Sequence, residues 1–192
     1  MKRIFRVLFF ISLPIALAGL FFSNHIILLV FGAQYIHAVT SLKILLWSVF
    51  TVFINIPFAT LLLASGKQMR YLMCVSIGAC VNFGLNLLLI PRLSHQGAAI
   101  ATIVTEIVVL VLLYVYSRKE IHIAIPGTVL RGVICSAALG AFFYTVSIAP
   151  IVEVLLGAIL YGILLKSIGG FSKEDVTMVV QVIKNRGQRS TV

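Results

Sequence analysis

Residues 90–116, IPRLSHQGAAIATIVTEIVVLVLLYVY, decide the fold. A proline–arginine turn is followed by three small residues, Gly97, Ala98 and Ala101, and then by an apolar run. The run is long enough to cross a bilayer, which takes about 20 residues of helix. One carboxylate, Glu106, lies near its middle. The stretch therefore predicts a membrane-spanning helix whose first half packs closely on a neighbour and whose middle presents one acid to other helices.

The composition of the whole chain supports a membrane protein. Its 192 residues are 61% hydrophobic and 10% charged, and the mean hydropathy is +1.14, whereas a soluble domain is about half apolar and a quarter charged. We therefore predict an all-α membrane protein in which residues 1–170 form one bundle of six spans. These are expected at about 4–22, 36–64, 71–90, 97–116, 128–148 and 151–168.

Local signals set the expected ends of the first two spans. Ser23-Asn24-His25 is expected to end the first span, and the short apolar piece 26–32 is then expected to lie at the surface or to re-enter the membrane. Pro57, close to Asn55, predicts a kink in the second span. The first 22 residues also fit a signal peptide, but the five further spans favour an uncleaved helix.

Basic residues predict the orientation. The chain carries 15 Lys and Arg against 5 Asp and Glu, a net charge of +10. With a cytoplasmic N-terminus, Arg92 falls in an outer loop and Lys43 within the second span, so 15 − 2 = 13 basic residues lie at the inner side. The positive-inside rule then places both termini in the cytoplasm. Residues 171–192 are expected to be a cytoplasmic tail with a short amphipathic helix on the membrane surface. Topology thus explains the charge, and we expect no nucleic-acid partner.

Small and polar residues mark faces that avoid lipid. The small residues predict helix packing at Gly97, Ala101, Gly132, Ser136 and Gly140. On the third span, Gly78, Asn82 and Asn86 recur every four residues, so the two amides either bond a neighbouring helix or line a wet cavity.

Two ionisable groups lie deep in spans, Glu106 near the midplane and Lys43 in the second span. Buried charges in a membrane usually face the bundle interior. Glu106 is therefore a structural acid or part of a pathway, and Lys43 either snorkels to the outer interface or joins that pathway. With Asn55, Asn82 and Asn86, they are the candidate substrate or ion pathway residues. No nucleophile, acid–base pair, metal-ligand spacing or phosphate loop occurs, so we expect no enzyme, no metal and no resident cofactor.

Residues 61–114 resemble polysaccharide-export flippases, the O-antigen (Wzx-type) branch of the multidrug/oligosaccharidyl-lipid/polysaccharide (MOP) exporter superfamily. The matching elements, in order, are the turn Ala64–Lys67, the paired asparagines before Ile90-Pro91, GAAIAT at 97–102 and the glutamate that follows. The pieces 28–39 and 169–176 also fit, and the resemblance extends over about 8–185.

The resemblance implies one half of a two-lobe transporter related in fold to the MATE exporters, namely its C-terminal lobe. Such a protein moves undecaprenyl-diphosphate-linked oligosaccharide, such as an O-antigen or capsule repeat unit, across the bacterial inner membrane. It works by alternating access, with possible coupling to H+ or Na+. The expected partners are the lipid-linked oligosaccharide and either an N-terminal lobe or a second copy. The alternatives are a drug or cation antiporter of the same superfamily and a non-transporting membrane assembly subunit.

Overall fold

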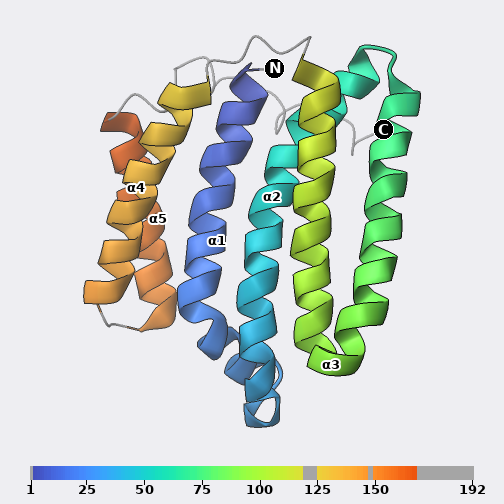
Figure 1. Ribbon diagram of the computed structural model, residues 1–192. Helices are drawn as coiled ribbons and strands as arrows, with labels where there is room; N and C mark the ends of the chain where they lie inside the picture. The colour runs from blue at the N-terminus through green and yellow to red at the C-terminus, as the bar shows by residue number, and fades with distance from the viewer. Residues whose placement is uncertain (1, 119–124, 147–148, 168–192) are drawn as a thin grey trace, which may run out of the picture.

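The computed structural model describes residues 2–118, 125–146 and 149–167, and nearly all of them are helical (Figure 1). No strand occurs in these ranges, in agreement with the predicted all-α class. The elements are α1 Lys2–Val30, a 3₁₀ helix η1 Ala33–Ala38, α2 Val39–Ala64, α3 Gln68–Ser117, α4 Ile125–Thr145 and α5 Pro150–Ser167. The amphipathic helix expected within residues 171–192 lies outside the described residues.

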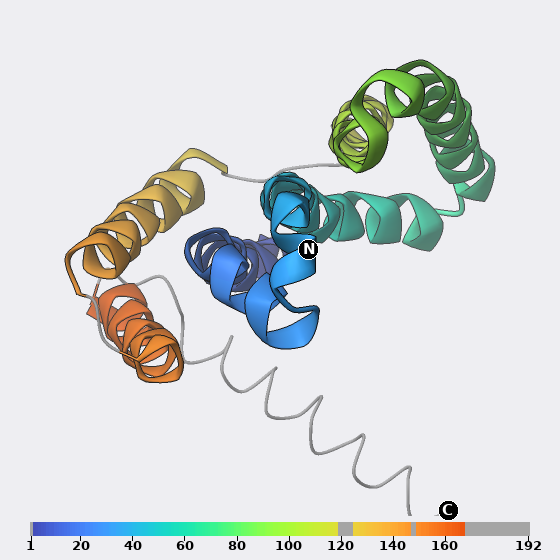
Figure 2. The same ribbon diagram turned by 90° about the horizontal axis from the view of Figure 1, so that it is seen from below.

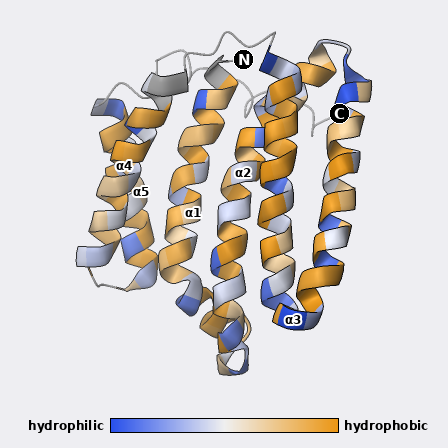
Figure 3. Cartoon of the chain, in the orientation of Figure 1, coloured by the Kyte–Doolittle hydropathy of each residue, from blue (hydrophilic) through white to orange (hydrophobic). Residues whose placement is uncertain are grey.

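Length and apolar character make several of these helices able to cross a membrane. Within the described ranges, four are long and apolar enough: Ile4–Val30, Ala33–Ala64, Gln68–Ser117 and Pro150–Ser167, and the apolar helix Val129–Thr145 is shorter. Hydrophobic residues cover most of each helix, and hydrophilic ones gather at helix ends and at the turn of α3 (Figure 3). Many large apolar side chains, such as Phe83 and Ile151, are exposed. The chain is therefore suited to a hydrocarbon surrounding.

Helix α3 is a hairpin of two antiparallel arms (Figure 1). The chain reverses at Ser94, whose φ of 49° and ψ of −129° are not helical. Gly97 then lies against the end of the first arm, where an added Cβ would be 2.5 Å from the carbonyl oxygen of Leu89. A close backbone approach of this kind needs glycine.

Helix α1 is longer than the sequence predicted. The expected break at Ser23-Asn24-His25 is wrong, because α1 continues to Val30. The hydroxyl of Ser23 donates to the carbonyl oxygen of Leu20 at 3.0 Å, so this polar residue is satisfied inside the helix. The piece 26–32 is therefore not a separate surface segment, since its first five residues are the end of α1. The chain turns at Gly32, whose φ is 88°.

The described helices form a curved row (Figure 2). Helix α2 packs against α1 on one side and α3 on the other, and α1 also contacts α4 and α5. Aromatic side chains fill the contact of α1 with α2, where Phe5 meets Phe58 at 6.0 Å and Phe9 meets Phe50 at 5.8 Å between ring centroids.

The end of α2 runs across toward α3 (Figures 1 and 2). Pro57 lies inside α2 and is buried. A proline inside a helix removes one backbone hydrogen bond and bends the axis, which accounts for this change of direction. Residues of α2 on both sides of Pro57 line a cleft together with both arms of α3, and the polar residues of these helices meet there.

Candidate functional site

A polar contact joins α2 to the second arm of α3. The side-chain amide of Asn55 donates to a carboxylate oxygen of Glu106, with 2.8 Å between Nδ2 and Oε2. The same Nδ2 lies 3.4 Å from the backbone oxygen of Glu106. Hydrogen bonds to a charged group are stronger than those between neutral groups. This contact therefore holds a half-buried acid of one helix to a buried amide of another.

A second chain of hydrogen bonds joins the two arms of α3. Asn86 Nδ2 donates to Asn82 Oδ1 at 2.8 Å, and Asn82 Nδ2 donates across the hairpin to Thr105 Oγ1 at 3.2 Å. Thr105 in turn donates to the carbonyl oxygen of Ala101 at 2.7 Å. The sequence left open whether these amides bond a neighbouring helix or line a cavity, and Asn82 does both.

These residues border a cleft of about 450 Å³ between α2 and the two arms of α3. Asn55, Asn82, Thr105 and Glu106 give it polar atoms, Tyr71 adds an aromatic ring, and the remaining lining is apolar or small. A concave site with a few convergent polar groups in an apolar wall is typical of ligand sites.

Small residues let the walls of the cleft approach. A Cβ added at Gly78 would lie 2.5 Å from the Cγ2 of Val109, so the first arm passes directly over the second. The predicted packing residue Gly132 serves the contact of α4 with α1 in the same way, because an added Cβ there would collide with the ring of Phe9. A Cβ at Gly140 would meet nothing within 4 Å.

The cleft contains more hydrogen-bond acceptors than donors. Asn55 is 7% exposed, and among the described residues nothing donates to its Oδ1. Outside the cleft lining, the Oδ1 of Asn86 is also buried with no donor among the described residues. A buried polar atom without a partner costs about 1–3 kcal/mol, so these oxygens are unusual and call for an explanation.

The structure does not bring Lys43 to this cluster. Lys43 is exposed in the second turn of α2. Twelve residues separate it from Asn55, and at the helical rise this is about 18 Å along the axis. Of the predicted pathway residues, Asn55, Asn82 and Glu106 line the cleft and Asn86 bonds to Asn82 from outside its lining.

Two notable polar residues were not among the predicted site residues: Thr105, which is in the cleft, and Glu153, which is buried elsewhere. Thr105 lines the cleft, whereas Thr102 bonds back to the carbonyl oxygen of Ala98 in its own helix. Glu153 is 6% exposed in the first turn of α5. A carboxylate at a helix N-terminus is stabilised by the helix dipole. In the sequence, an acid at the start of an apolar run was the signal that could have drawn attention to Glu153. Glu153 does not line the cleft.

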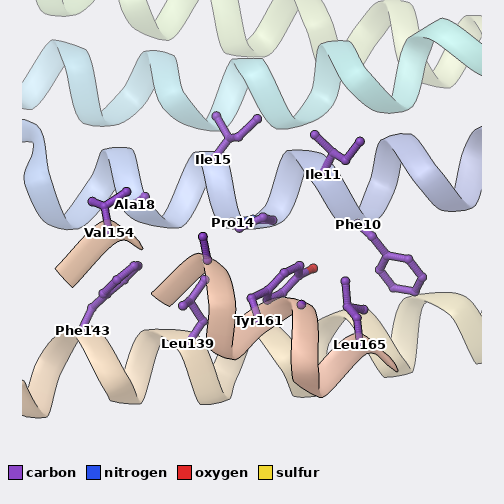
Figure 4. Close-up of a pocket in the computed structure, with 12 residues that line it drawn as sticks. Phe10, Ile11, Pro14, Ile15, Ala18, Leu139, Phe143, Val154, Tyr161 and Leu165 are labelled. Atoms are coloured by element: carbon purple, nitrogen blue, oxygen red, sulfur yellow. The ribbon is translucent and has the colours of Figure 1, made fainter. Parts of the chain in front are cut away.

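A second cavity, of about 340 Å³, lies between α1, α4 and α5. Figure 4 shows Phe10 of α1 pointing toward the side where Tyr161 and Leu165 of α5 lie, and Leu139 and Phe143 of α4 also line the cavity. Its lining is apolar apart from the hydroxyl of Tyr161, so it suits hydrocarbon and not a polar group.

The metal-binding residue types are dispersed. Within the described residues, no group of three His, Cys, Asp or Glu side chains could hold a metal ion. Cys74 and Cys135 are buried, Cys80 is exposed, and all three are free thiols. The chemistry on which a function can be built is therefore that of the cleft.

Comparison of the chain with protein-family models, with curated proteins and with solved structures found no match in any of the three.

Proposed function

We propose that this chain is a six-span lobe of a flippase that moves undecaprenyl-diphosphate-linked oligosaccharide across the bacterial inner membrane. In this assignment the two arms of α3 are separate spans, α4 is a span, and both termini lie in the cytoplasm. The observation that carries the proposal is the Asn55–Glu106 contact in a cleft between otherwise apolar helices. Acids and amides placed deep in a membrane usually mark a substrate or ion pathway.

The place of the cleft residues in the sequence also supports a flippase. Its polar residues on α3 fall within the stretch 61–114 that resembles the polysaccharide exporters, and Asn55 lies just before it. Amide, carboxylate and hydroxyl groups are suited to the hydroxyl groups of a sugar. The apolar cavity beside α1 has no such groups.

A drug antiporter is less well supported. A site for lipophilic cations is expected to combine aromatic rings with several acids. The cleft has one acid, Glu106, and one aromatic side chain, Tyr71. The lining therefore favours the hydroxyl-rich sugar part of a lipid-linked oligosaccharide over a lipophilic cation.

Alternating access requires two bundles that rock about a shared site. In the curved row of helices, α2 and α3, which border the cleft, lie toward one end, and α4 and α5 lie at the other end. We propose that a second unit, an N-terminal lobe or another copy of this chain, completes the transporter.

Complementation tests the proposal. A bacterial strain that lacks its O-antigen flippase would express this chain alone, or this chain joined behind the N-terminal lobe of the strain's own flippase. The joined protein should restore surface polysaccharide, and the chain alone should not. Restoration by the chain alone would favour two copies as the working unit.

Variants at two buried or half-buried acids, Glu106 in the cleft and Glu153 outside it, make this test more specific. Glu106→Gln in the joined protein should lower surface polysaccharide more than it lowers the amount of protein, because it removes the charge in the cleft. Glu153→Gln, a matched control on α5, should lower both together or neither. A joined protein that is inserted at normal level but leaves the oligosaccharide on the inner leaflet would refute the proposed function.

A further inference from the structure

The apolar cavity between α1, α4 and α5 is elongated along the helix axes. Its lining on α5 extends from Val154 to Leu165, and its lining on α1 extends from Phe10 to Ala18. At the helical rise per residue, these stretches are about 16 and 12 Å long. The hydrocarbon core of one leaflet is about 15 Å thick, half that of the bilayer. The length and the lining of the cavity therefore suit a stretched hydrocarbon chain.

Small side chains keep this space open on its α5 wall. Ala158 and Gly162 are one turn apart and both line the cavity, and a Cβ added at Gly162 would meet nothing within 4 Å. Ile11 and Val154, which also line it, are 40% and 37% exposed, so the cavity is open to its surroundings. In a membrane these surroundings are hydrocarbon without water, and a lipid chain can enter from them.

Two basic residues lie just beyond one end of the cavity. Arg6 precedes the lining residue Phe10 by four positions, on the same face of α1, and Lys166 directly follows the lining residue Leu165. The start of α1 and the end of α5 lie at the same end of the row of helices (Figure 1). The proposed orientation places this end at the cytoplasmic side of the membrane.

Arg131 of α4 adds a third positive charge at this end. It is exposed and comes one residue before Gly132, where an added Cβ would collide with the ring of Phe9 on α1. Arg131 therefore lies at about the height of Phe9, close to the end of the cavity at Phe10. Long basic side chains extend their apolar stems along a helix and carry the charge to the membrane interface.

We propose that this cavity binds an acyl chain of an anionic phospholipid of the cytoplasmic leaflet, and that Arg6, Arg131 and Lys166 hold its phosphate. Basic pockets between membrane helices on the cytoplasmic side attract anionic head groups, and a guanidinium binds phosphate with two parallel hydrogen bonds. The ammonium group of phosphatidylcholine would be repelled by the same three charges. The site therefore prefers phosphatidylglycerol, and the bound lipid ties α4 and α5 to α1.

The transported lipid of the proposed function would occupy a different place. The cleft with Asn55 and Glu106 lies on the α3 side of α2, whereas this cavity lies on the α4 and α5 side of α1. Helices α1 and α2 pack against each other between the two spaces. A lipid with its sugar in the cleft would have to extend across both helices to reach the cavity. Phospholipid binding therefore does not rest on the flippase assignment.

Photolabelling of the natural chain is the first test. The whole chain would be placed in phosphatidylcholine nanodiscs with a small share of phosphatidylglycerol that carries a diazirine on one acyl chain, and mass spectrometry would locate the label. The label is expected within 10–18 and 154–165. A phosphatidylcholine probe with the same diazirine should label these ranges much less and should mark outward side chains, such as Phe83, which is 68% exposed.

Competition identifies the occupant. Excess unlabelled phosphatidylglycerol should remove the label from the cavity, and undecaprenyl phosphate at the same concentration should not. Equal labelling of the cavity by both probes, or labelling of outward side chains only, would overturn the proposal. Equal competition by undecaprenyl phosphate would assign the cavity to prenyl lipids and would overturn it as well.

Variants test the two parts of the site separately, with circular dichroism to show that each is helical. Gly162→Leu fills the cavity and should abolish the preferential labelling by phosphatidylglycerol. Gly140→Leu is its control, because Gly140 also has open space around an added Cβ but does not line the cavity.

The charges are tested one at a time. Changing Arg6, Arg131 or Lys166 to Gln should each weaken phosphatidylglycerol binding by about fivefold, the usual effect of one basic residue on an anionic lipid surface. Arg70→Gln removes the same charge from the start of α3 and should leave the labelling of the cavity unchanged. An equal loss in Arg70→Gln would show that only the overall charge of the chain matters, and the assignment of the three residues would be wrong.

Discussion

Replacing Gly97 by alanine should destabilise the α3 hairpin, whereas the same replacement at Gly84 should not. Both glycines lie in α3. An added Cβ at Gly97 would meet the backbone of Leu89, at 2.5 Å from the carbonyl oxygen and 2.6 Å from the carbonyl carbon. An added Cβ at Gly84 would meet nothing within 4 Å. Comparing the two variants therefore isolates the effect of one close contact, that of Gly97 with the backbone of Leu89.

The magnitude follows from the distances. Ordinary contact of a Cβ begins at 3.4 Å, so the Leu89 carbonyl would have to move by 3.4 − 2.5 = 0.9 Å. Backbone in a helical turn cannot rotate away as a side chain does, and overpacking of this kind costs about 1–3 kcal/mol. Alanine favours helix over glycine by about 1 kcal/mol, and this gain is common to both variants. Gly97→Ala should thus be less stable than Gly84→Ala by about 1–3 kcal/mol.

Unfolding in mixed micelles measures this difference. Both variants and the natural chain would be titrated with sodium dodecyl sulfate, and loss of helix would be followed by far-ultraviolet circular dichroism. Gly84→Ala is expected to unfold at or above the detergent concentration of the natural chain, and Gly97→Ala clearly below it. Equal stability of the two variants would show that the hairpin relaxes freely at the turn, and the assignment of Gly97 to a close backbone contact would be wrong.

Further expectations concern orientation, the polar contacts and the bend of α2. A membrane-impermeant thiol reagent applied to intact cells should label a Ser94→Cys variant of a chain freed of its own cysteines, but not Gln68→Cys, and the opposite result would reverse the orientation. Asn82→Leu should lower the free energy of unfolding by about 0.6 kcal/mol, the usual value of a hydrogen bond between membrane helices, and a loss beyond about 2 kcal/mol would indicate a larger role. Pro57→Ala should let α2 run straighter and separate its end from α3, so cross-linking between cysteines placed on these helices should fall, and unchanged cross-linking would place the cause of the bend elsewhere.

The helices themselves were largely predictable because their signals are local. The reversal after Pro91 follows from a short polar segment between two apolar runs, and the structure turns at Ser94 within it. The expected bounds of the last two spans, 128–148 and 151–168, differ by at most three residues from α4 and α5. The error at Ser23 has a physical cause, since a serine can satisfy its hydroxyl on its own helix and so need not end it.

Composition and the lengths of the apolar runs, both available from the sequence by itself, determined that the chain is suited to a membrane and that its described ranges are helical, and they predicted an acid and several amides within the apolar helices. The tertiary structure alone decided which of them meet. Asn55 and Glu106 are 51 residues apart in the chain, and their contact depends on how the second arm of α3 is placed beside α2 and rotated about its own axis. That rotation also places Thr105 and not Thr102 in the cleft lining, since the two lie three positions apart and therefore about 60° from each other around the helix. Such angles are set by packing between helices, which no single segment encodes.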